Sequence, residues 1–143
     1  MSKTLGRRAV IGSALGLGMA SAAAADTQTF TAGPKGNTMV YVAAWDCPPC
    51  IQWKNNYKPD FVASPQYKKL TLRMIDAHSI KTAYEASYWP EDLLPFRAYL
   101  IERKWIGVPR FSFLKDGKIV SSEWGVSGWV SKVWPSIQQT IKA

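Results

Sequence analysis

The sequence predicts an α/β fold. Short β-prone segments alternate with helical segments along the chain, and one of these strands leads straight into a Cys-Pro-Pro-Cys motif that opens a helix. An Asp-Gly hairpin signal and a final helix follow near the C-terminus. The 143 residues are enough for one domain with a substantial core.

The first 25 residues have the pattern of a secretory signal peptide. The start is basic, with Lys3, Arg7 and Arg8. An apolar run rich in Gly and Ala follows at residues 9–20, and three alanines ending at Ala25 offer a signal-peptidase site. An uncleaved N-terminal anchor is the alternative, although the run is short for a stable span. The paired arginines also resemble a twin-arginine export signal. We expect cleavage near Ala25, a domain at 26–143 and a periplasmic location.

The charge of the chain gives no indication of nucleic-acid binding. Removing the signal segment takes away three of the 18 basic residues and none of the 10 acidic ones, which leaves a net charge of +5. The remaining lysines and arginines are scattered and predict a solvated surface.

Cys47 and Cys50 are the only cysteines of the chain. They lie between a predicted buried strand at 39–44 and a helix at 48–58, which Pro59 stops or kinks. The free N–H groups and the dipole of a helix N-terminus favour a thiolate, so Cys47 should ionise easily. Cys50, one turn on, is close enough to form a disulfide. We expect Cys47 to be exposed and Cys50 to be covered.

Three other uses of the two cysteines are alternatives to redox chemistry. A structural disulfide over so short a loop would contribute little loop-closure entropy. A zinc site needs about four ligands, and His78 is the only histidine. Copper(I) could bind two thiolates, but Met39 and Met74 are expected in the core rather than as a third ligand. Thiol–disulfide exchange is the favoured hypothesis, with no organic cofactor and no metal.

The remaining elements are predicted from hydrophobic spacing and turn residues. In chain order we expect an edge strand at 27–31, a helical piece at 61–69 interrupted at 64–65, a strand at 70–75, a helix starting at 89–92, strands at 111–114 and 119–123 around a hairpin turn, and a helix at 127–142.

Two sets of apolar side chains recur at helical spacing and predict buried faces. They are Leu93, Phe96, Leu100 and Ile101 in the helix that starts at 89–92, and Val130, Trp134, Ile137 and Ile141 in the helix at 127–142. Just before the first set lie Tyr84, Tyr88 and Trp89. These aromatic side chains form either a small packed core or a substrate surface, and packing is the favoured interpretation.

From about residue 38 to the C-terminus, the chain resembles the thioredoxin superfamily. The motif at 47–50 opens a helix after a buried strand, and a second strand ends at Asp76. Residues 106–109 (IGVP) match the loop that holds the family's cis-proline, and 111–118 match its final hairpin. The resemblance implies a central mixed sheet with helices on both faces and, here, a longer helical insert at 77–104 before the cis-proline loop.

The resemblance also implies roles for individual residues. Cys47 would attack a disulfide and Cys50 would resolve the intermediate. The Val108 backbone beside Pro109 would pair with an extended substrate segment, and Arg110 and Trp45 complete the predicted substrate-binding set. A trans Pro109 that merely starts a strand is the alternative.

The chain departs from the family pattern near the motif. Tyr41 falls where thioredoxins carry a buried Asp, and Asp46 replaces the Trp that usually precedes the first cysteine. Asp46 would either raise the pKa of the thiolate or relay protons. Arg110 would stabilise a nearby thiolate, or it would be an exposed charge without a role.

These features predict an exported, monomeric oxidoreductase that reduces the disulfides of selected partner proteins. Because the compartment is oxidising, a membrane electron donor, such as a thiol-reducing transporter, would be required. A disulfide oxidase or isomerase of the same fold is the first alternative. The oxidants of this superfamily commonly carry a His between the cysteines, whereas Pro48 and Pro49 stand there in this chain. A redox-inactive or copper-delivering module is the second alternative.

Overall fold

The computed structural model describes residues 33–143. The predicted signal segment at 1–25 and the predicted edge strand at 27–31 lie outside the described residues. The strands are β1 (Asn37–Ala44), β2 (Thr71–Ala77), β3 (Arg110–Lys115) and β4 (Lys118–Trp124). The helices are α1 (Pro48–Asn56), α2 (Lys58–Ala63), α3 (Leu94–Glu102), α4 (Gly125–Gly128) and α5 (Trp134–Thr140), with a π-helical turn (Trp129–Val133) between the last two.

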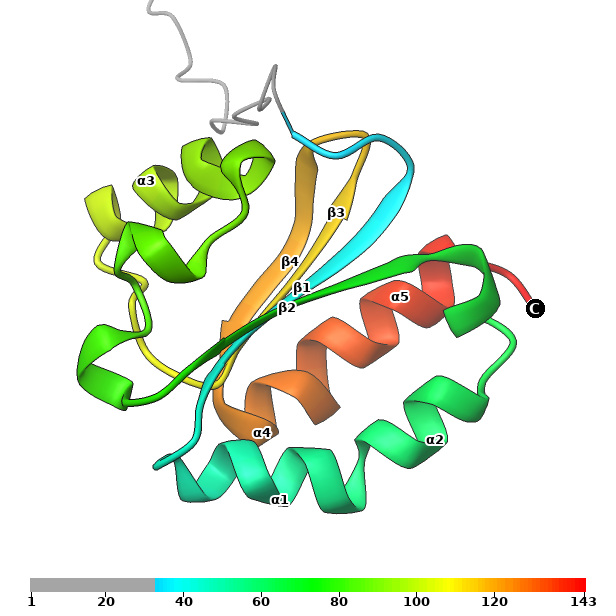
Figure 1. Cartoon of the computed structure of the whole chain (residues 1–143). Helices are drawn as coiled ribbons and strands as arrows, with labels where there is room; N and C mark the ends of the chain where they lie inside the picture. The colour runs from blue at the N-terminus through cyan, green and yellow to red at the C-terminus, as the bar shows by residue number, and fades with distance from the viewer. Residues whose placement is uncertain (1–32) are drawn as a thin grey trace, which may run out of the picture.

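The four described strands form one mixed sheet in the order β2-β1-β3-β4. β1 pairs in parallel with β2 and antiparallel with β3, and β3 pairs antiparallel with β4. Figure 1 shows α1, α2, α4 and α5 on one face of this sheet and α3 with the neighbouring short turns on the other. Because both faces are covered, β1 is apolar and buried almost throughout, as parallel-paired central strands usually are. The predicted α/β class, the mixed sheet and the helical insert are confirmed.

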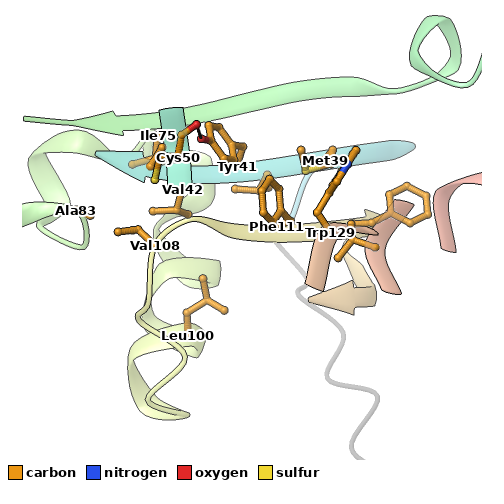
Figure 2. Close-up of a cluster of buried hydrophobic side chains, with 14 of the residues drawn as sticks. Met39, Tyr41, Val42, Cys50, Ile75, Ala83, Leu100, Val108, Phe111 and Trp129 are labelled. Atoms are coloured by element: carbon orange, nitrogen blue, oxygen red, sulfur yellow. Dashed lines mark hydrogen bonds between the residues drawn. The ribbon is translucent and has the colours of Figure 1, made fainter. Parts of the chain in front are cut away.

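An aromatic cluster fills the space between the sheet and the helices α1, α4 and α5. Tyr41 of β1 lies 4.5 Å from Trp53 of α1 and 5.3 Å from Phe111 of β3, measured between ring centroids. Trp129 meets Trp53 edge-on at 5.3 Å. Figure 2 labels Tyr41, Phe111 and Trp129 of this cluster and shows Cys50 next to Tyr41. The core therefore continues up to the cysteine motif.

The helix after the motif ends earlier than the sequence predicts. α1 stops at Asn56, and Tyr57 caps it by donating its N–H to the Trp53 carbonyl at 2.9 Å. Pro59 lies in the first turn of α2, where a missing N–H leaves no hydrogen bond unmade. Pro59 thus begins a helix rather than ending one.

Two of the predicted core residues outside the insert are exposed instead. Met74 lies on β2, which is an edge strand of the described sheet and is covered less fully than β1. Val130 points to solvent because the wide π-helical turn shifts the apolar stripe by one position. The buried side chains of this run recur every four residues: Trp129, Val133, Ile137 and Ile141.

The buried side chains of the insert before the cis-proline loop belong to the same hydrophobic core as those of the sheet. The indole N–H of Trp89 donates to the Ala83 carbonyl at 2.9 Å, and the rings of Trp89 and Tyr84 lie 5.7 Å apart. Leu93, Phe96 and Leu100 are buried, whereas Ile101, which the spacing also placed inside, is exposed. Packing is therefore the better interpretation of Trp89, while Tyr84 is only half-buried and reaches the loop described below.

Candidate redox-active site

The Cys-Pro-Pro-Cys segment lies where β1 turns into α1. Cys47 is the N-cap residue of α1, and its Sγ accepts a hydrogen bond from the Cys50 N–H at 3.2 Å. The two cysteines form a disulfide with their Cα atoms 5.2 Å apart. One sulfur therefore lies at a helix N-terminus, where backbone N–H groups and the helix dipole stabilise negative charge.

The expected exposure of Cys47 is wrong for this disulfide form. Its side chain is 1% exposed, as is that of Cys50. The prediction rested on position alone, since Cys47 precedes the helix. In the folded chain the disulfide itself and the end of the core cover both sulfurs, and Figure 2 shows Val42 and Val108 at the same end as Cys50.

Tyr41 of β1 contacts the backbone of the second cysteine. Its hydroxyl donates to the Cys50 carbonyl at 3.3 Å. Burial, and to a lesser extent the negative charge of Asp76, raises the pKa of Tyr41 well above its ordinary value. The position where the resemblance places a buried carboxylate thus holds a group that stays protonated and can donate a hydrogen bond, but does not accept a proton near neutral pH.

An ion pair lies beside Tyr41 and was not foreseen from the sequence. Lys54 Nζ of α1 lies 3.1 Å from Asp76 Oδ2 at the end of β2. The second carboxylate oxygen, Oδ1, is buried without a hydrogen-bond partner. The sequence marked Asp76 only as the end of a strand, and the pairing depends on how α1 packs over β2.

The two residues before Cys47 are tied to the start of the insert. The Trp45 N–H donates to the Ala77 carbonyl at 2.9 Å, and the exposed Trp45 ring lies 4.2 Å from the His78 ring. The carboxylate of Asp46 accepts from the Ile80 N–H at 2.7 Å and from Ser79 Oγ at 3.2 Å. A substrate role for Trp45 and an effect of Asp46 on the thiolate stay predictions.

The predicted substrate loop ends in a cis bond between Val108 and Pro109. Three of its carbonyls are already hydrogen-bonded. The Tyr84 hydroxyl lies 3.1 Å from the Gly107 oxygen, the Trp124 indole N–H donates to the Val108 oxygen at 3.0 Å, and the Gly125 N–H donates to the Pro109 oxygen at 2.8 Å. The sequence did not single out Trp124, whose place beside the loop follows from the pairing of β3 with β4.

Arg110 is not the exposed charge that the sequence left open as an alternative. Its side chain is only 7% exposed, and it donates to Ser122 Oγ at 3.0 Å and lies over the Trp105 ring at 5.5 Å. Burial lowers its pKa, an effect that the nearby Tyr84 and Glu123 oppose. These partners lie on β4, in the insert and directly after it, and an effect of Arg110 on the thiolate stays a prediction.

The arrangement holds two cysteines that can cycle between a dithiol and a disulfide. Such a pair exchanges electrons with another disulfide through a mixed disulfide and needs nothing besides the two sulfurs. Within residues 33–143, no group of three or more His, Cys, Asp and Glu side chains is placed to hold a metal ion. No helix in that range is long and apolar enough to cross a membrane.

Comparison with known proteins adds a structural similarity. No protein-family model and no curated protein sequence matches the chain. Among solved structures, it is similar to the thioredoxin of Malassezia sympodialis, with a TM-score of 0.49 and 16% identity over 76% of this chain and 77% of that one. A likeness at this level transfers no residue roles, so the chemistry must be argued from the cysteines of this chain and their surroundings.

Proposed function

We propose that this chain is an exported thiol–disulfide oxidoreductase that reduces disulfides in selected partner proteins. The observation that carries the proposal is the position of Cys47 Sγ at the N-cap of α1, where it accepts a backbone N–H and is bonded to Cys50. A sulfur at a helix N-terminus with a second cysteine in the first turn combines an activated nucleophile with a resolving thiol.

The reaction would proceed in two exchange steps. In the reduced protein, the Cys47 thiolate attacks one sulfur of the partner's disulfide, and the other sulfur leaves as a thiolate and takes up a proton. Cys50 then loses its proton and attacks Cys47 Sγ, which releases the second partner thiol and forms the Cys47–Cys50 disulfide. Two electrons and two protons pass to the partner, and the oxidoreductase ends in the disulfide form.

The reducing direction is proposed from the residues between the cysteines. Pro48 and Pro49 carry no charge and have no N–H to donate to a Cys47 thiolate, whereas a His there would stabilise it. Less stabilisation of the thiolate favours a reductant. In an oxidising compartment a membrane electron donor would have to reduce Cys47–Cys50 again, while residues 1–25 would direct export and be removed near Ala25.

Trapping of a mixed disulfide tests the mechanism. We expect Cys50→Ala to accumulate a covalent adduct with a disulfide protein such as insulin, because no resolving thiol remains. Cys47→Ala is the matched control and should form no adduct through Cys50. Mass spectrometry under non-reducing conditions measures both, and equal trapping by the two variants would remove the assigned roles.

The reduction potential of the pair tests the direction. Equilibration with glutathione or dithiothreitol buffers should give a value near that of thioredoxin, about −270 mV, rather than the value of about −120 mV found for a strong oxidant. A value near the latter would reverse the proposed direction and leave the exchange chemistry intact.

A further inference from the structure

The Val108 carbonyl is covered by a side chain that is itself mostly in solvent. The Trp124 indole donates its N–H to this oxygen at 3.0 Å. Val108 is only 7% exposed, whereas Trp124 is 60% exposed. If a substrate strand pairs with the Val108 backbone, its N–H must reach the oxygen that the indole already binds.

The absence of a side chain at position 107 permits this contact. A Cβ added to Gly107 would lie 2.6 Å from Trp124 Nε1, closer than real Cβ atoms approach other atoms. The indole therefore lies directly over Gly107, and any larger residue there would push it off the loop. The loop and the end of β4 fit each other through this glycine.

The three donors that bind the loop carbonyls differ in how easily they can move away. The Gly107 oxygen is bound by the half-buried Tyr84, and the Pro109 oxygen is bound by the Gly125 backbone, which cannot leave without moving the chain. Trp124 can leave by rotating its side chain, since most of its surface is already in water. The Val108 oxygen is thus the position where a substrate N–H can replace the protein's own donor without unfolding the loop.

We propose that Trp124 is a specificity-determining residue that competes with the substrate backbone for the Val108 carbonyl. The proposal rests on the proposed function. A partner with an extended segment beside its disulfide must displace the indole before it pairs, and it gains one hydrogen bond while the protein loses another. A small disulfide that brings only its sulfurs to Cys47 has no backbone to pair and does not compete with Trp124.

Trp124→Phe removes the N–H and keeps an aromatic ring over Gly107. We expect kcat/KM for insulin reduction to rise about two- to tenfold, the range that corresponds to one net hydrogen bond. With bis(2-hydroxyethyl) disulfide as the substrate, kcat/KM should stay unchanged. Trp105→Phe is the matched control, because it alters another exposed indole, one that immediately precedes the loop. It should change neither value.

Gly107→Ala provides a second variant that leaves the indole N–H in place. Its added methyl group should push the ring away from the carbonyl, so it should raise insulin reduction selectively, as Trp124→Phe does. An unchanged or lower insulin kcat/KM in both variants, or an equal change with both substrates, would overturn the competition. If the wild-type protein reduces neither substrate, the proposed function itself fails and Trp124 has no such role. If it reduces both and the variants match it, only the role of Trp124 fails.

Discussion

The cysteine turn and the substrate loop are built by different kinds of contact. The turn is held by its own helix, since Cys47 Sγ accepts the Cys50 N–H and the Cys47 carbonyl accepts the Ile51 N–H at 3.1 Å. The loop is held by side chains from distant segments, Tyr84 before it and Trp124 after it. Local contacts form whenever the helix forms, whereas the loop needs the insert and β4 in place. Changes at the turn should therefore alter chemistry with little effect on the fold, and changes at the loop should alter both.

The largest effect is expected at Cys47. Cys47→Ser should abolish insulin reduction, because a hydroxyl is not a competent nucleophile toward a disulfide. The serine Oγ can still accept the Cys50 N–H, so the helix cap should survive. Cys47→Ala also abolishes activity and loses the cap. We expect urea unfolding in dithiothreitol to find the Ala variant about 1 kcal/mol less stable than the Ser variant. Equal stabilities would show that the cap at this turn contributes nothing.

A loss of stability is expected at the loop when Tyr84 loses its hydroxyl. Tyr84→Phe removes the donor that lies near the Trp105 and Gly107 carbonyls and a polar group that faces Arg110. Leaving a partly buried carbonyl without its partner costs about 1–3 kcal/mol, measurable by urea unfolding. Tyr88→Phe, in the same insert, is the control and should cost less. A Tyr84→Phe variant as stable as the wild type would mean that the loop does not depend on the insert.

Tyr84 also makes the free energy of unfolding depend on pH in the alkaline range. Burial raises its pKa well above the ordinary value, despite the opposing charge of Arg110, and Tyr41 is raised in the same direction. Below the unfolded-state pKa of about 10, both tyrosines are protonated in both states and stability is unaffected. As the pH rises above it, the unfolded chain ionises first and the free energy of unfolding falls. Tyr84→Phe should make this decrease less steep, which unfolding curves between pH 8 and about 11 would test.

The same division explains what the sequence could predict. The strand, the motif and the helix N-terminus around Cys47 are contiguous, and their residue types determine the local geometry. The side chains that donate to the loop carbonyls, Tyr84 and Trp124, are distant from the loop in the sequence. Nothing near Trp124 marks it as a donor to a carbonyl 16 residues earlier, because that contact depends on the antiparallel register of β3 and β4. The predicted burial of Val130 is wrong for a related reason, because hydrophobic spacing does not indicate a π-helical turn.

The smallest effect is expected at Asp46. This residue directly precedes the cysteine turn and is bound by residues more than 30 positions away in the sequence. Its two carboxylate oxygens are bound by Ile80 and Ser79, and the residue is exposed. Asp46→Ala should therefore cost about 0.5–1 kcal/mol in urea unfolding, a typical value for an exposed hydrogen-bonded group. Asp46→Asn keeps an acceptor oxygen for the Ile80 N–H and should cost less.

The same two variants distinguish two ways in which Asp46 could act on Cys47, through its hydrogen bonds to the insert or through its negative charge. If Asp46 acts on the thiolate through its charge, both variants should change the rate at which iodoacetamide alkylates reduced Cys47 at pH 7, and by the same factor. If it acts by holding the turn against the insert through hydrogen bonds, only Asp46→Ala should change that rate. Because both oxygens are bound by the insert, we expect the second result. Equal rate changes in Asp46→Asn and Asp46→Ala would show instead that the charge of Asp46 alters the reactivity of Cys47. The chemistry of the turn would then depend on more than the hydrogen bonds within its own helix.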